Sequence, residues 1–124
     1  MGREVRILVV EDSATVRRLI EFHLKKIPGV ELEEAEDGLV AMEKLSSDRY
    51  DLVITDILMP RMDGLKLVNY IRSNEKLKKL PILILTTKGG DEDRKKGMEL
   101  GANAYVAKPI DPREFMEAVL RLLE

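Results

Sequence analysis

The sequence contains no cysteine, a single histidine and no long hydrophobic run. The lack of cysteine excludes disulfide bonds and thiolate metal sites, and one histidine excludes a histidine-based metal cluster. His23 lies on or beside the apolar stripe of an expected helix, so we expect an ordinary half-buried residue rather than a phosphodonor. No stretch is long enough for a signal peptide or a transmembrane helix, and we therefore expect a cytoplasmic protein.

The charge balance is also nearly even. The formal net charge is −2, which argues against a protein that binds nucleic acid or membranes through charge. Hydrophobic residues make up 44% of the 124 residues, which is enough to bury a core. With no internal repeat or linker, residues 1–124 are expected to form one domain.

Short apolar runs alternate along the chain with segments in which apolar residues recur at helical spacing. The expected strands cover residues 6–10, 30–35, 51–55, 82–85 and 103–107. The expected helices follow Ser13 (with Asp12 or Ser13 as cap), Gly38, Gly64, Asp91 and Asp111, and Pro28 stops the first. This alternation predicts an α/β fold, a doubly wound parallel sheet with five helices on its two faces.

Two of these elements have distinctive patterns. Residues 30–35 alternate apolar with acidic side chains, which is typical of a strand near a sheet edge. The fourth helix, for which Asp91 is the expected cap, contains Gly97 and only two large apolar residues, Met98 and Leu100. An internal glycine costs about 1 kcal/mol relative to alanine, so this helix is expected to be weak.

Polar residues stand at the carboxyl ends of four of the five strands. They are Glu11, Asp12, Asp56, Thr86 and Lys108. Because parallel strands end at the same edge, these side chains should meet there. Converging carboxylates repel one another unless a hard cation such as Mg²⁺ lies between them. A carboxylate can attack phosphorus to form an acyl phosphate, and phosphoryl transfer needs mainly positioning and charge neutralisation.

Four segments then resemble a known family. VVEDS (9–13), VITDILMPRMDG (53–64), LTTKG (85–89) and YVAKP (105–109) are similar to the receiver domain of two-component response regulators. The similarity is greatest to the single-domain, CheY-like members, and it extends over essentially the whole chain. It implies a flavodoxin-like sheet with strand order 2-1-3-4-5.

The resemblance also implies the roles of the acidic residues. Asp56 would be the phosphoacceptor, and Mg²⁺ would be held by Asp12, Asp56 and the backbone carbonyl of Leu58, with Glu11 acting through water. Lys108 would pair with the phosphoryl group and precede a cis peptide bond to proline.

A switch and its partners are implied in the same way. Thr86 would hydrogen-bond the arriving phosphoryl group, and Tyr105 would move between outward and inward positions in step with it. The donor would be a phosphohistidine on a histidine kinase or phosphotransfer protein. The chain would not be an enzyme beyond its own phosphorylation and dephosphorylation, and its output partner would be a protein, not nucleic acid or membrane.

Three positions depart from the family pattern. Leu58 and Lys88 stand two residues after Asp56 and Thr86, where chemotaxis-type receivers often have amide or acidic residues that place the hydrolytic water. An apolar Leu58 predicts slow self-dephosphorylation. Thr87 stands where a smaller residue is common, and this could restrict Tyr105.

Other interpretations remain open at this point. Asp56 could cap the next element, Lys108 could be a surface lysine, and Glu11 a solvated acid. Thr86 could reflect strand propensity and Tyr105 plain packing. The chain could be a receiver from a longer regulator, an aspartate-nucleophile phosphatase, or a non-phosphorylated interaction module. The apolar Leu58 argues against the phosphatase, which commonly has an acid at that position.

Overall fold

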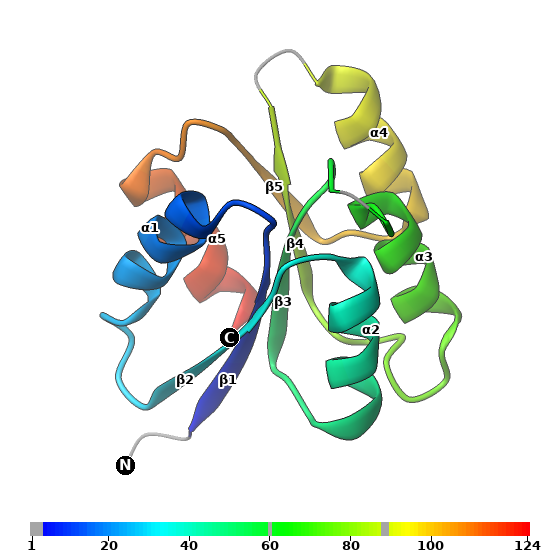
Figure 1. Cartoon of the computed structure of the whole chain (residues 1–124). Coiled ribbons are helices and arrows are strands. Elements are labelled where there is room, and N and C mark those ends of the chain that lie inside the picture. The colour runs from blue at the N-terminus through cyan, green and yellow to red at the C-terminus, as the bar shows by residue number, and fades with distance from the viewer. Residues whose placement is uncertain (1–3, 60, 88–89) are drawn as a thin grey trace.

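A computed structural model describes residues 4–59, 61–87 and 90–124, in which five strands alternate with five helices (Figure 1). The strands are β1 (Val5–Val10), β2 (Val30–Ala35), β3 (Leu52–Asp56), β4 (Ile82–Thr86) and β5 (Ala104–Ala107). The helices are α1 (Ala14–Leu24), α2 (Gly38–Ser47), α3 (Gly64–Ser73), α4 (Asp91–Leu100) and α5 (Pro112–Leu122). The turn expected at Pro60 and the loop expected at Lys88–Gly89 lie outside the described residues.

The strands form one parallel sheet with the order β2-β1-β3-β4-β5. The predicted fold class and strand order are therefore confirmed, and β2 is the edge strand that its acidic alternation indicated. In the register of the sheet, Asp56 pairs with Leu85 and Thr86 pairs with Ala107. This register brings the carboxyl ends of the central strands to one edge.

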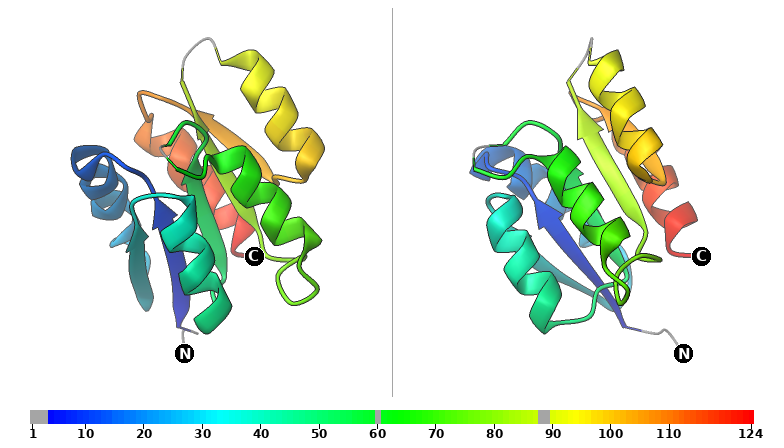
Figure 2. Two further views of the ribbon diagram at one scale, coloured as in Figure 1. Left: turned by 45° about the vertical axis from the view of Figure 1, so that its right-hand side comes forward. Right: turned by 90° about the vertical axis from the view of Figure 1, so that its right-hand side faces the viewer.

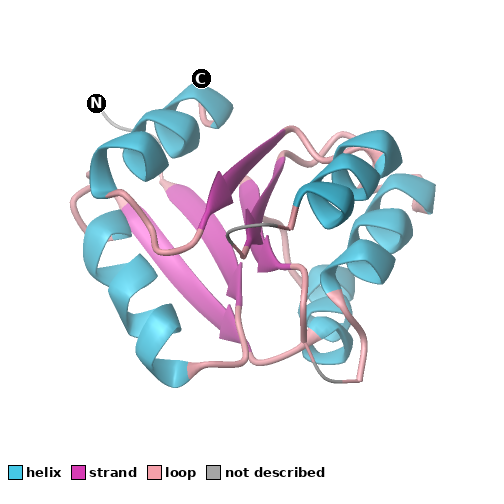
Figure 3. Cartoon of the chain, turned by 90° about the horizontal axis from the view of Figure 1, so that it is seen from above, coloured by secondary structure: helices cyan, strands magenta, loops and turns pink. Residues whose placement is uncertain are grey.

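Two helical layers cover the sheet, with α1 and α5 on one face and α2, α3 and α4 on the other (Figures 1 and 3). Figure 2 shows the second group side by side. Alternate residues of each central strand enter opposite cores; in β1, Leu8 faces one cluster and Val9 the other. This burial on both faces explains why the strands are continuous apolar runs.

Short polar side chains cap the N-terminal ends of most of the helices. Ser13 caps α1, because its Oγ accepts the Val16 N–H at 3.3 Å, and this decides between the two expected caps. Aspartates cap α2, α3 and α5 (Asp37, Asp63 and Asp111). The prediction of Asp91 as cap of α4 was wrong. Asp91 is the first residue of the helix, and Gly90 occupies the cap position without a side-chain hydrogen bond.

The end of α1 differs from the sequence-based expectation. The helix ends at Leu24, earlier than the stop expected at Pro28, although Ile27 still packs in the core. His23 is 8% exposed, so the expectation of a half-buried residue was wrong. The folded chain buries the ring, which contacts Phe22 edge-on.

The loop after β3 approaches α3 closely. A Cβ on Gly64 would collide with the Asp56 carbonyl oxygen and the Ile57 Cα, and the Gly64 N–H donates to the Ile57 carbonyl at 2.8 Å. Only glycine fits there, so this residue sets the path of the chain out of Asp56.

Over the described residues, every helix is too short or too polar to cross a bilayer.

Candidate functional site

Three carboxylates meet at the carboxyl edge of the sheet. Glu11 follows β1, Asp12 stands before the cap of α1, and Asp56 is the last residue of β3. One carboxylate oxygen from each lies within 4.8 Å of the others. Glu11 and Asp56 are 1% and 5% exposed, whereas Asp12 is open to solvent. The arrangement is a pocket with two buried acids and one accessible acid.

Lys108 reaches this pocket from the end of β5. Its Nζ donates to Glu11 Oε1 at 2.9 Å and to Asp56 Oδ2 at 2.8 Å. Its backbone N–H donates to the Thr86 carbonyl at 2.7 Å, and the peptide bond to Pro109 is cis, as the family resemblance implies. Lys108 is therefore part of the pocket and not a free surface lysine.

The electrostatics leave the pocket with an excess of negative charge. Burial raises the pKa of Glu11, and the hydrogen bonds from Lys108 and Ser13 offset this only in part. Burial alone would lower the pKa of Lys108, but its hydrogen bonds to Asp56 and Glu11 outweigh burial and raise it. A protonated lysine thus faces three carboxylates. A hard divalent cation fits this donor set, because Mg²⁺ takes one or two carboxylates together with waters and phosphate oxygens.

Leu58 lies in the loop that leaves β3, with its side chain 57% exposed. This loop is tied to the start of α2, since Arg61 forms an ion pair with Asp37 and the Gly38 N–H donates to the Met62 carbonyl at 3.1 Å. The role of the Leu58 carbonyl as a metal ligand stays a prediction.

The two predicted switch residues lie on neighbouring strands. Thr86 ends β4 and is 5% exposed. Tyr105 of β5 is 41% exposed, and its hydroxyl accepts a hydrogen bond from Arg94 at 2.9 Å. The Arg94 guanidinium carbon also lies 4.7 Å from the centre of the Tyr105 ring. Tyr105 is thus in an outward position under an arginine of α4.

The structural roles of three arginines, which hold the residue Glu11 of the site or the ends of neighbouring helices, were not predicted from the sequence. Arg17 Nη1 donates to the Glu11 carbonyl at 2.6 Å, Arg61 binds Asp37, and Arg72 binds the Gly101 carbonyl at 2.9 Å. The partners of Arg61 and Arg72 are 24 and 29 residues away. Helical periodicity does not encode such contacts.

Comparisons with known proteins agree with this geometry. The family model described as "Response regulator receiver domain" matches residues 7–120. The chemotaxis protein CheY1 of Helicobacter pylori is 39% identical over 120 residues, covering 94% of this chain and 97% of that protein. The transcriptional regulatory protein ResD of Bacillus subtilis is also 39% identical over 120 residues, covering 97% of this chain. The chain spans only 48% of the length of ResD.

Solved structures match equally well. A putative response regulator from Chloroflexus aurantiacus has a TM-score of 0.93 and 35% identity, with 98% of each chain covered. The receiver domain of the sensor histidine kinase PA1611 from Pseudomonas aeruginosa has a TM-score of 0.87 and 30% identity, with 98% of each chain covered. That structure has a magnesium ion coordinated in its active-site cleft. The Glu11, Asp12 and Asp56 triad is typical of such a Mg²⁺ site. By fold, site and sequence, the chain belongs to the response regulator receiver domain family of two-component signalling.

Proposed function

We propose that Asp56 accepts a phosphoryl group from a phosphohistidine in a Mg²⁺-dependent reaction. Receiver domains partner with histidine kinases and are not conventional enzymes. The donor proposed here is a histidine kinase or a phosphotransfer protein. The observation that carries the proposal is the Asp56 carboxylate, which lies beside two further acids and is held by Lys108 Nζ at 2.8 Å.

The transfer exchanges one bond to phosphorus for another. An Asp56 carboxylate oxygen forms a bond to phosphorus while the bond from phosphorus to the histidine nitrogen breaks, and that nitrogen keeps the electron pair and takes up a proton. Glu11, Asp12, Asp56 and the Leu58 carbonyl would hold Mg²⁺. When bound, the ion supplies positive charge beside the phosphoryl oxygens. Lys108 pairs with a phosphoryl oxygen from the other side.

The test is the intact mass of the protein after incubation with Mg²⁺ and acetyl phosphate, with Asp56→Asn treated in parallel. We expect a single phosphoryl adduct in the wild type, none in the variant, and none when EDTA removes the metal. Failure with acetyl phosphate calls for the same measurement with a phosphohistidine donor. A folded protein that accepts from neither would favour the non-phosphorylated interaction module.

The proposed output is a change on the face formed by β4, α4 and β5. Thr86 moves toward the phosphoryl group and Tyr105 follows inward, which alters the surface offered to a downstream protein. The support is the position of Thr86 at the edge of the pocket and the weak anchoring of α4, which buries only Gly97. Helix α1 and the Pro109–Ile110 loop are the proposed contact for the kinase.

Leu58 sets the expected lifetime of the acyl phosphate. Its side chain is apolar and 57% exposed, so it offers no hydrogen bond to a hydrolytic water. We expect slow self-dephosphorylation, followed by the loss of the adduct mass with time, and faster loss in Leu58→Asn. Fast decay in the wild type that Leu58→Asn leaves unchanged would contradict this expectation.

The extent of the functional unit belongs to the same proposal. We place residues 1–124 in one receiver domain that acts in the cytoplasm. The match to ResD keeps open the alternative that this receiver works within a longer regulator, and the sequence of the complete gene distinguishes the two.

A further inference from the structure

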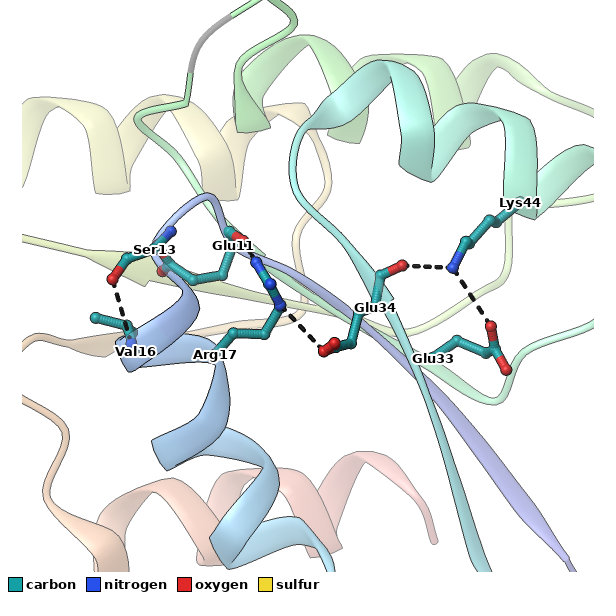
Figure 4. A network of polar contacts seen from close by, with 7 residues as sticks. All are labelled: Glu11, Ser13, Val16, Arg17, Glu33, Glu34 and Lys44. Carbon is teal, nitrogen blue, oxygen red and sulfur yellow. Dashed lines mark hydrogen bonds and ion pairs between the residues drawn. The ribbon is translucent and has the colours of Figure 1, made fainter.

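Arg17 on α1 joins the acidic pocket to the edge strand. Its Nη1 donates to the backbone carbonyl of Glu11 at 2.6 Å, and its Nε donates to Glu34 Oε2 at 3.2 Å. Figure 4 shows the side chain extending between these two residues. Only 17% of the side chain is exposed. The guanidinium therefore holds one oxygen atom from the residue after β1 and one from β2, with little freedom of its own.

The Glu11 carbonyl belongs to the peptide unit that leads into Asp12. The other polar groups of Glu11 are also held: its N–H donates to the Ala35 carbonyl at 3.0 Å, and its carboxylate accepts the Ser13 N–H at 3.0 Å. Because the peptide unit is planar, the direction of this carbonyl fixes the point at which the chain enters Asp12. A hydrogen bond from Arg17 to this carbonyl therefore constrains the direction in which the chain enters Asp12.

Glu34 is itself anchored, so Arg17 is bound to a stable support. Lys44 Nζ of α2 donates to the Glu34 backbone carbonyl at 2.6 Å and lies 3.4 Å from Glu33 Oε1 (Figure 4). The network connects α1, the edge strand β2 and α2. The acidic residues of β2 therefore do more than protect a sheet edge, since one of them orients Arg17.

We propose that Arg17 is a positioning residue for the metal site, and that it acts by fixing the peptide unit between Glu11 and Asp12. This inference rests on the Mg²⁺-dependent function proposed above. If only the charge of Arg17 mattered, the arginine would weaken Mg²⁺ binding, because a guanidinium near the three carboxylates repels the metal ion. Removal of Arg17 weakens Mg²⁺ binding if positioning dominates and strengthens it if charge dominates.

The experiment measures the Mg²⁺ dissociation constant by isothermal titration calorimetry for the wild type, Arg17→Gln, Arg17→Lys and Arg18→Gln. Arg18 is the matched control, since it is exposed and its side chain makes no hydrogen bond or ion pair with the rest of the described chain. We expect Arg17→Gln to bind Mg²⁺ roughly tenfold more weakly, as for loss of an outer partner of a metal ligand. We expect Arg18→Gln to match the wild type or bind slightly more tightly.

Arg17→Lys separates geometry from charge. It keeps the positive charge but lacks the planar fork that reaches two acceptors, so its affinity should fall between those of the wild type and Arg17→Gln. Urea unfolding of each variant in EDTA measures stability separately. A variant that loses stability but binds Mg²⁺ as tightly as the wild type would show a purely structural role and overturn the proposal.

Glu34→Gln keeps the test decisive if Arg17→Gln does not fold. It weakens the support of Arg17 Nε while leaving the arginine in place, and we expect weaker Mg²⁺ binding than in the wild type. Unchanged binding in Glu34→Gln would then overturn the proposal. A wild type that fails to bind Mg²⁺ would refute the metal-dependent function as well, whereas equal binding by the wild type and Arg17→Gln would refute only the role of Arg17.

Discussion

The two sides of the pocket are built very differently. On the acidic side, α1 is capped by Ser13 and buries Ile20, His23 and Leu24, and Arg17 fixes the preceding turn. On the other side, α4 begins at Gly90 without a side-chain cap, and Gly97 is its only buried residue over the fully described span 91–100. Local unfolding is easiest where few apolar contacts hold an element. The fold thus keeps rigid the turn that presents the acids and leaves α4 easy to displace.

The weakness of α4 does not extend along its whole length. Arg72 binds the Gly101 carbonyl at 2.9 Å and Asn103 Oδ1 at 2.8 Å, and it also binds the Leu80 carbonyl at 2.7 Å. These contacts fasten the end of α4 that lies far from the pocket. Weak anchoring is therefore concentrated at the end of α4 that begins at Gly90.

Replacement of Lys108 should have the largest effect, because this residue follows β5 and its Nζ binds Glu11 and Asp56 on the acidic side. In Lys108→Met we expect phosphorylation by acetyl phosphate to slow by about 100-fold, the usual effect of losing one positioned donor in a transition state. Mg²⁺ affinity should rise, because the carboxylates lose their cation. Adduct mass against time and calorimetry measure the two effects. Lys95→Met, an exposed site on α4, is the control, and an equal rate in both variants would contradict this role.

Replacement of Arg72 should have the next largest effect, on stability. Arg72→Met removes the side-chain donor of three backbone carbonyls, those of Lys78, Leu80 and Gly101, and one of the two donors to Asn103 Oδ1. We expect the free energy of unfolding to fall by about 2 kcal/mol. Urea denaturation measures the change. Lys66→Met on the same helix removes an exposed charge and should change stability by less than about 0.5 kcal/mol. Equal losses in the two variants would show that Arg72 does not fasten α4.

Arg72 also shows what could be predicted from the sequence. The alternation of strands and helices and the converging acids followed from apolar runs and helical spacing, because these patterns are local. The strand order was implied only by the family resemblance. The Arg72 contacts depend on loops brought together only by the complete fold. The start of α4 was missed for a related reason: Asp91 has the chemistry of a cap, but the helix begins one residue earlier, with Gly90 as cap. Likewise, His23 is a polar residue in the sequence, yet its side chain is buried in the fold.

The next prediction concerns Asp37, which supports the loop after β3 through its ion pair with Arg61. We expect the stability of the fold to depend on the charge of this residue. Burial alone would raise its pKa, but hydrogen bonds from the Val40 N–H and Arg61 outweigh burial and hold the pKa below its ordinary value. A carboxyl group whose pKa is lower in the folded state stabilises the fold at pH values above its pKa in the unfolded chain. This contribution is lost as the pH falls through the pKa of the folded state. Asp37→Asn keeps a capping side chain but removes the negative charge at the start of α2, so it should cost about 1 kcal/mol at pH 7. The difference from wild type should shrink below about pH 4.

Urea denaturation at several pH values measures this effect. Asp63→Asn is the control, since Asp63 caps α3 through the Lys66 N–H but lacks the link to Arg61. A difference between Asp37→Asn and wild type that stays constant from neutral to acid pH would contradict the role of its charge.

The smallest expected effect tests the weakly anchored side of the pocket, through the contact of α4 with Tyr105. Arg94 holds Tyr105 outward through a hydrogen bond at 2.9 Å and a guanidinium over the ring. An exposed contact of this kind is worth about 0.5–1 kcal/mol. If phosphorylation favours the inward position, Arg94→Gln should reduce the concentration of beryllium fluoride, a phosphoryl analogue, at half-saturation by about two- to fivefold. Lys95→Gln makes the same charge change beside it and should have no such effect. An equal half-saturating concentration in Arg94→Gln and wild type would mean that Tyr105 does not move inward when the phosphoryl analogue binds. The weak anchoring of α4 would then have a role other than this switch.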